Sequence, residues 1–376
     1  MKVLLLSPLP PPVGGIASWT VNVLEYYSDK NEIEIIHQDT SIKFRRITNS
    51  GFVRRFFSGG IGAFVTLWGF ICGAIAFKPD VAHITSSGSL GLIRDFVICF
   101  AAKVLGIPVV IHFRYGRIPM VKEAKNWEWL LVKQVTTLCS HAIVLDVSTH
   151  SALVSSGFSN VSFVPNPIPK GLEELAVNNS QITDGELTDA KAKVLFVGHV
   201  TKEKGVFELV QACLNLHSIL ELIFVGPYET EIKDAILGFC TGSRVEVRFL
   251  GVLDKEEVLA QVRAAAMLVL PSYSEGFPNV VVEAMAMKCP VVATSVGAIP
   301  SILDADSESP CGLLVRPKDV KSLSDAIQKL ISNRELAEKI GDNAYRKVVS
   351  KYTLAKVCAH YESIWKCASK SRISNV

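Results

Sequence analysis

The sequence predicts an α/β protein with two domains, each built around a doubly wound parallel sheet. Short apolar runs alternate with longer helical segments along the chain, which is the pattern of repeated βαβ units. Two such series of similar length are separated by a polar stretch that begins with several prolines. The chain has 376 residues, of which 49% are hydrophobic, so it is long enough to bury two cores.

The first half contains a series of apolar runs that we interpret as strands: Lys2–Ser7, Ile33–His37, Val81–Thr85, Val109–Phe113, His141–Leu145 and Val161–Val164. The first run is interrupted by Ser7 and Pro8, so it is too short for the apolar region of a signal peptide. It is typical of the first buried strand of a parallel sheet. These runs predict a first domain over residues 1–168.

The second half repeats this pattern after a linker that we expect over residues 169–192. Its strands are expected at Lys193–Val197, Glu221–Val225, Glu246–Phe249, Met267–Leu270, Val291–Thr294 and Gly312–Val315. They predict a second domain over residues 193–350. The last segment, 351–376, carries Tyr361, Ile364 and Trp365 at helical spacing. We expect it to form a helix that packs back on the first domain.

The composition excludes several classes of protein. A formal charge of +3 is too small to predict nucleic-acid binding, which requires a concentrated basic face. The nine cysteines form no C-x-x-C pair, and their number is odd. This pattern favours reduced thiols in a cytoplasmic protein over a disulfide framework or a zinc site.

The segment Ser274–Ala286 is the strongest functional signal in the sequence. We expect Asn279 to be an N-cap, which would leave the amides of Val280 and Val281 as donors for a diphosphate at a helix N-terminus. Glu275 would lie on the preceding loop, and Glu283 about one turn into the helix, where a carboxylate can bind the hydroxyls of a ribose. Taken alone, the two acids have an equally good explanation without a ligand. Glu275 would be a solvated acid of the loop, and Glu283 an acid favoured by the dipole at the start of the helix.

Other segments favour the functional interpretation. The turn Gly198–Gly205 follows a strand, and its Lys204 could neutralise phosphate, although a charged surface turn is the alternative. Gly226 and Gly297 also follow strands, and ligands bind at this edge of an open parallel sheet.

This combination resembles glycosyltransferase family 4, over nearly the whole chain and in its bacterial polysaccharide type. The resemblance implies the GT-B fold, with two Rossmann-like domains facing each other across a cleft that binds a nucleotide sugar, and transfer with retention of anomeric configuration. It implies that Glu275 binds hydroxyls of the transferred sugar, Glu283 the ribose and Lys204 the diphosphate. Further donor-binding positions implied by the resemblance are the amides of Phe277, Asn279 and Val280, and Arg248 near the base. Many members carry arginine where this chain has His199. A neutral histidine offers one N–H donor, whereas the guanidinium of arginine offers several donors and a permanent positive charge.

The first half adds two positions to the resemblance. Gly14 and Gly15 open a helix after the first strand, and Gly15 would reach the donor phosphate. His112 ends a strand and resembles the family histidine near the anomeric centre; a satisfied polar residue is the alternative. For Arg114 and Arg117, an anionic acceptor and ordinary surface charge are equally good explanations.

The run Gly60–Phe77 is almost entirely apolar and approaches the lower limit of a transmembrane helix. We prefer a helix packed on the sheet, because glycines interrupt it and strands flank it. Just upstream, cations and aromatic residues are interleaved: Lys43, Phe44, Arg45, Arg46, Phe52, Arg54, Arg55, Phe56 and Phe57. Such a sequence favours contact with an anionic bilayer, which would suit a lipid-linked acceptor.

The sequence therefore predicts a retaining, hexosyltransferase-like glycosyltransferase that moves a sugar from a nucleotide sugar to a lipid-linked or other saccharide acceptor in surface polysaccharide or glycolipid synthesis. We expect no metal ion and no cofactor, and a cytoplasmic location with peripheral contact to the inner membrane. Two alternatives stay open: a GT-B epimerase or hydrolase of nucleotide sugars, and a non-catalytic GT-B scaffold protein.

Overall fold

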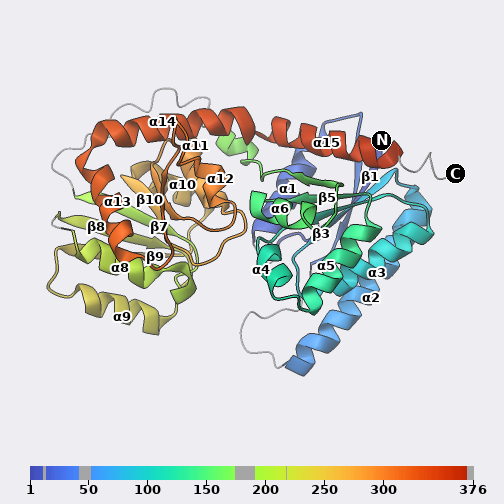
Figure 1. Ribbon diagram of the computed structural model, residues 1–376, viewed down its shortest axis with the longest axis horizontal. Coiled ribbons are helices and arrows are strands. Elements are labelled where there is room, and N and C mark those ends of the chain that lie inside the picture. Colours follow the sequence, from blue (N-terminus) through green and yellow to red (C-terminus); the bar gives the residue numbers. More distant parts are fainter. Residues whose placement is uncertain (12–13, 42–51, 174–190, 217, 371–376) are drawn as a thin grey trace. The chain divides into compact units, whose positions relative to one another are not determined.

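The computed structural model describes residues 1–11, 14–41, 52–173, 191–216 and 218–370, without the side chains of 52–61. It divides into two compact units (Figure 1). Unit 1 comprises Met1–Pro167 and Leu354–Val376, and unit 2 comprises Ile168–Thr353. Most of the expected linker, residues 174–190, lies outside the described residues. Ile168, expected at the end of the first domain, and Leu172, expected in the linker, are both buried in the core of unit 2.

Unit 1 contains a six-stranded parallel sheet in the order β2-β1-β3-β4-β5-β6. Its strands are β1 (Lys2–Ser7), β2 (Glu34–Asp39), β3 (Val81–Ser86), β4 (Val109–Phe113), β5 (His141–Val144) and β6 (Val161–Phe163). β1, β3 and β4 are buried on both faces, which explains why most of their residues are apolar.

Helices cover both faces of this sheet. On one face lie α1 (Gly15–Ser28) and the last helix, α15 (Leu354–Lys370), which pack together with Val3, Leu5 and Val110. On the other face lie α2 (Phe52–Phe77), α3 (Gly91–Val104) and α5 (Trp127–Leu138), side by side in Figure 1. Two shorter helices, α4 (Ile118–Glu123) and α6 (Val147–Val154), complete this layer.

Unit 2 contains a second six-stranded parallel sheet, in the order β12-β11-β10-β7-β8-β9. Its strands are β7 (Ala192–Val197), β8 (Leu220–Val225), β9 (Val245–Gly251), β10 (Met267–Leu270), β11 (Val291–Thr294) and β12 (Leu313–Val315). The helices are α8 (Val206–Leu214), α9 (Thr230–Cys240), α10 (Lys255–Ala264), α11 (Asn279–Ala286), α12 (Ile299–Leu303), α13 (Val320–Ser332) and α14 (Arg334–Lys351). A short 3₁₀ turn, η1 (Lys202–Lys204), follows β7.

The predicted fold class is confirmed: both sheets are parallel, doubly wound and flanked by helices. Each strand predicted from the sequence forms, with ends that differ by two residues at most. The signal was strong because a strand buried on both faces must be apolar at every position, whichever way its side chains point.

The long apolar run of the first half lies in α2. Among the helices of the described residues, none combines the length and the apolarity needed to cross a bilayer. The cationic and aromatic side chains predicted to contact a membrane, from Lys43 to Phe57, lie outside the described side chains.

Candidate functional site

The sheet of unit 2 has its topological switch point between β7 and β10. From β7 the chain builds outward through β8 and β9, and then returns to the other side of β7 to add β10, β11 and β12. The loops after β7 and β10 therefore leave the same edge of the sheet in opposite directions. In open α/β sheets, this divergence creates the crevice in which ligands bind.

Lys204 and Glu275 meet at this switch point. Lys204 ends η1, after β7, and Glu275 lies on the loop after β10. The lysine Nζ is 2.6 Å from Oε1 of the glutamate, and the hydroxyl of Ser272 donates to the same oxygen at 2.6 Å. The side chain of Glu275 is 12% exposed and that of Lys204 is 30% exposed. The structure thus brings these two candidate residues into contact within unit 2, and their roles with substrate stay predictions.

Glycines bring the loops of this edge into backbone contact. Gly205 has φ of +69°, and a Cβ at this position would lie 2.1 Å from the carbonyl oxygen of Pro271. Gly297 has φ of +55°, and a Cβ there would lie 2.1 Å from the carbonyl oxygen of Glu275. Only glycine satisfies both conditions. The amide of Ala298 also donates to the carbonyl of Gly276 at 2.9 Å, so the backbone around Glu275 is held from two sides.

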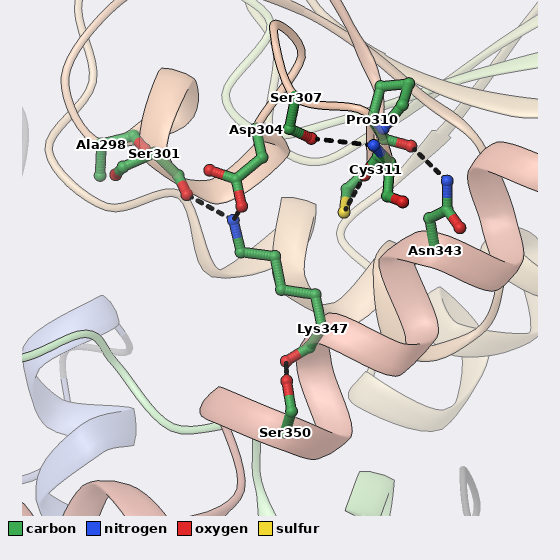
Figure 2. Close-up of polar contacts among 10 residues, drawn as sticks. Ala298, Ser301, Asp304, Ser307, Pro310, Cys311, Asn343, Lys347 and Ser350 are labelled. Carbon is green, nitrogen blue, oxygen red and sulfur yellow. Dashed lines mark hydrogen bonds and ion pairs between the residues drawn. The ribbon is translucent and has the colours of Figure 1, made fainter.

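A buried lysine, Lys347, stabilises the short helix α12, which follows the loop of Gly297. Lys347, from α14, donates to the carbonyl of Ser301 at 2.6 Å and pairs with Asp304, which ends α12 (Figure 2). Its side chain is 7% exposed, and this burial lowers its pKa while Asp304 opposes the shift. Because α12 begins beside Gly276, the contact of Lys347 helps to position the loop that carries Glu275.

Glu283 lies in α11, as expected, but its surroundings differ from those of Glu275. Burial raises its pKa, and the charge of Lys255, at the start of α10, lowers it in part. A partly desolvated carboxylate without an ion pair among the described residues is suited to accept hydrogen bonds from paired hydroxyls.

The beginning of α11 corrects one prediction. The N-cap is Pro278, in extended conformation, and Asn279 is the first residue of the helix. Proline is tolerated at this end of the helix because its missing N–H would have no partner inside the helix. The amide of Val281 donates to the carbonyl of Pro278 at 3.1 Å, so it is not the free donor that the sequence predicted. The roles expected for the amides of Phe277, Asn279 and Val280 stay predictions.

The other donor-binding positions of unit 2 differ in their availability. His199 is exposed in the loop after β7. Phe277 is half-buried, and its ring packs edge-on against Tyr352. Arg248, on β9, forms an ion pair with Glu221 of β8, at 2.8 Å. A contact between Arg248 and a base would require this pair to open.

In unit 1, Gly15 begins α1 at the carboxyl edge of the sheet, after the extended and exposed Gly14. His112 is fully buried at the end of β4, between His83 and Arg114. Arg117 pairs with Glu128 at 2.7 Å and donates to the hydroxyl of Ser89. The proposed contacts of these residues with substrate stay predictions.

The chain contains one Asp-x-Asp sequence, Asp304-Ala-Asp306. Asp304 forms the ion pair with Lys347, and the described residues contain no group of three potential metal ligands.

Sequence reasoning missed Ser272, His83 and Tyr361. Ser272 follows β10 by two residues, and this position at the ligand-binding edge was the available signal. The helical spacing placed Tyr361 on a packing face, but its hydrogen bond with Trp19 had no local signal, because the two residues are far apart in the sequence.

The sequence of unit 2 matches a known family. Residues 179–347 match the family model described as glycosyl transferases group 1. The matched segment contains Lys204, Glu275 and Glu283.

Two relatives extend the similarity into unit 1. A sulfoquinovosyl transferase of Arabidopsis thaliana is 28% identical over 297 residues, which cover 73% of this chain and 54% of the plant protein. The capsular polysaccharide biosynthesis glycosyltransferase CapM of Staphylococcus aureus is 26% identical over 308 residues, 77% of this chain and 78% of that protein. This chain thus spans about half the length of the plant relative.

A solved structure shares the fold of the whole chain. The crystal structure of Anabaena HepE in complex with UDP superimposes with a TM-score of 0.67, covering 96% of this chain and 99% of that one, at 16% sequence identity. The two-sheet architecture described above is thus the GT-B fold.

Proposed function

We propose that this protein is a glycosyltransferase that takes a sugar from a nucleotide sugar and transfers it, with retention of configuration, to a saccharide acceptor. The Lys204–Glu275 pair at the switch point of unit 2 carries the proposal. Support comes from the family matched by residues 179–347, and from the relatives whose names describe glycosyl transfer. The UDP bound to the HepE structure makes uridine nucleotides the first donors to test.

The Lys204–Glu275 ion pair can open when a substrate binds, because each of the two residues then gains a new partner from the substrate. Without ligand, each residue neutralises the other, so neither charge is buried alone. We infer that an entering diphosphate takes the ammonium of Lys204. Glu275, still held by Ser272, then accepts hydrogen bonds from hydroxyls of the sugar. Because the backbone contacts of Gly205 and Gly297 already fix both loops, little reorganisation is needed.

The proposed reaction breaks the bond between the anomeric carbon and the donor phosphate. It forms a bond from that carbon to the acceptor oxygen on the same face of the sugar. Lys204 stabilises the negative charge that grows on the leaving diphosphate, and one of its oxygens takes the proton of the acceptor hydroxyl. Positive charge develops on the sugar ring in the transition state, as in other glycosyl chemistry. The proposal includes no metal ion and no cofactor.

Paired variants of the full chain test this function. The donor panel comprises UDP-, GDP- and ADP-sugars, screened first by thermal stabilisation. Lys204→Ala and Glu275→Gln should each lower transfer at least about 100-fold, the usual effect of removing one electrostatic contact to a transition state. Lys202→Ala is the matched control, because Lys202 belongs to the same turn but is exposed.

Three outcomes separate the alternatives. Full activity in both Lys204→Ala and Glu275→Gln contradicts the proposed site. Turnover of the donor at full rate without any acceptor identifies an epimerase or hydrolase. A chain that binds no nucleotide or nucleotide sugar in calorimetry is a scaffold.

We also propose that the acceptor is lipid-linked, in surface polysaccharide or glycolipid synthesis, and that unit 1 meets it at the cytoplasmic face of the inner membrane. The support is an apolar outer face on α2 and α3. Large side chains more than one-third exposed there are Phe64, Val65, Trp68, Ile75, Ile93, Val97, Phe100 and Val104. They repeat at helical spacing on neighbouring helices (Figure 1). Exposed apolar faces of this extent mark interaction sites, and aromatic residues are favoured at bilayer surfaces.

Sedimentation with vesicles tests the membrane contact. The protein should bind phosphatidylglycerol vesicles, and Trp68→Ser together with Phe100→Ser should weaken this binding. Substituting Val252 and Phe239, which are similarly exposed in unit 2, should not. Equal binding by both double variants would contradict the assignment to α2 and α3.

A further inference from the structure

Arg114 of unit 1 is a buried cation without an acid. It follows β4, its amide donates to the carbonyl of Ser86 at 2.8 Å, and the residue is 9% exposed. No carboxylate of the described residues pairs with it. The buried acids of unit 1 have other partners: Asp95 pairs with Arg94, Glu128 with Arg117, and Asp146 with Thr149. A buried charge without a counter-charge is costly, so its retention requires an explanation.

The neighbours of Arg114 are rings that carry no negative charge. The guanidinium lies 4.6 Å from the centre of the Trp19 ring, in a cation–π contact, and donates to the hydroxyl of Tyr361. Its Nε is buried without a hydrogen-bond partner. Burial, and then the charge of Arg114, lower the pKa of His83 to about 3 and that of His112 well below its usual value. Both histidines are therefore neutral at pH 7.

The hydrogen bonds of the two histidines determine where their protons lie. The indole N–H of Trp365 can only donate, so Nδ1 of His83, 3.0 Å away, accepts. Neutral His83 then carries its proton on Nε2 and donates to Nδ1 of His112, at 3.3 Å. His112 consequently carries its own proton on Nε2. That nitrogen lies 3.3 Å from Nη1 of Arg114, which is also a donor.

Two donors thus face each other, and neither can accept from the other. The hydroxyl of Ser7, at the end of β1, is also buried without a partner. The pairing of β1 with β3 ends at Leu6 and Ile84, the residues just before Ser7 and Thr85, and Thr85 is paired with His112, so all three lie near the carboxyl edge of the sheet. The first turn of α1 contains no acid and has no side-chain cap. Unmatched donors, a positive charge and a helix N-terminus on one sheet edge are the chemistry of an anion site.

We propose that Arg114 and His112 bind one oxyanion of a substrate, a phosphate or carboxylate group, at the carboxyl edge of the unit 1 sheet. This rests on the proposed function for the identity of the substrate, but the binding itself does not. The oxyanion would accept from both residues and supply the missing counter-charge. It comes either from the donor diphosphate or from an anionic acceptor.

Thermal unfolding with inorganic phosphate or pyrophosphate tests the site, at an ionic strength kept constant with sodium chloride. All five tryptophans lie in unit 1, so their fluorescence reports its unfolding. Phosphate should raise the midpoint of the native chain. Arg114→Gln should weaken phosphate binding at least tenfold, and Arg114→Lys less. Arg117→Gln is the control, because Arg117 already has Glu128: this variant should lower the midpoint but keep the phosphate effect.

The outcomes are separable from those of the proposed function. An equal phosphate effect in the native chain and Arg114→Gln, or none in the native chain, overturns the proposal. If Arg114→Gln does not fold, an unchanged phosphate affinity in Arg114→Lys overturns it, because a point charge cannot replace the two-pronged guanidinium. Saturating UDP-sugar abolishes the phosphate effect if the donor supplies the oxyanion, and leaves it if the acceptor does. A phosphate effect in a chain that binds no nucleotide sugar refutes only the proposed function.

Discussion

Both units contain a doubly wound parallel sheet, with different strand orders, and they treat charge differently at the carboxyl edge of that sheet. In unit 2, Lys204 meets Glu275 across the switch point, and a hydroxyl donates to the same carboxylate. In unit 1, Arg114 is buried among neutral rings and pairs with no acid of the part of the chain that the structure describes. In unit 2, Glu275 therefore supplies the counter-charge of Lys204, whereas no described residue supplies one for Arg114, and the proposed anion would do so. The comparison shows that a missing partner can indicate a ligand as clearly as a matched pair indicates a prepared site.

The largest effect that we expect comes from the backbone contacts of unit 2. Gly205→Ala would place a Cβ 2.1 Å from the carbonyl oxygen of Pro271, in a left-handed backbone conformation. We expect a loss of at least about 3 kcal/mol in the free energy of unfolding, because strain and overlap add together. Gly106→Ala in unit 1 is the control: Gly106 has a similar φ of +66° but nothing within 4 Å. It should lose only about 1 kcal/mol. Denaturant unfolding followed by circular dichroism measures both, and similar losses would contradict the steric argument.

The second effect separates the units by their response to acid. Burial lowers the pKa of His83 to about 3 in the folded state, whereas an unfolded histidine titrates near about 6.5. Below this value the unfolded chain binds more protons, so this histidine makes unit 1 less stable as the pH falls. The loss should reach about 2 kcal/mol at pH 5. Glu283 of unit 2, whose pKa is raised by burial, acts in the opposite direction.

Tryptophan fluorescence at several pH values measures this loss in unit 1 alone. His83→Gln is the informative variant, because an amide can accept from Trp365 and donate to His112 without titrating. It should reduce the dependence of the midpoint on pH between 6.5 and about 5. An unchanged dependence would show that His83 is not held neutral.

The smallest effect on stability concerns Arg248. Its ion pair with Glu221 is half-exposed, so Arg248→Ala should leave the free energy of unfolding almost unchanged. If Arg248 binds the base, this variant should still weaken nucleotide binding about fivefold, as expected for one hydrogen bond. Glu221→Gln releases the guanidinium without removing it and should not weaken binding. Calorimetry with UDP decides, and equal affinities for all three proteins would remove Arg248 from the site.

Much of the fold and part of the site could be predicted from the sequence. The central strands were recognisable because burial on two faces makes most of their residues apolar, as in β1, β3 and β4. Lys204 and Glu275 were recognisable because each follows a strand, and parallel strands bring such loops to one edge. The N-cap at Asn279 was wrong by one residue, because Pro278 can fill an N-cap without using an N–H.

The sequence by itself determined two α/β units and the pair of loops that carry Lys204 and Glu275. Only the tertiary structure decided that Glu275 is held by Ser272, that Lys347 supports the neighbouring helix, and that Arg114 is buried with no acid among the described residues as its partner. The physical reason is the distance along the sequence over which each feature is determined. Hydrophobic period and strand ends are local properties of the chain, whereas the environment of Arg114 is made by Trp19, His112 and Tyr361, which meet only when α1 and α15 pack on the same face of the sheet.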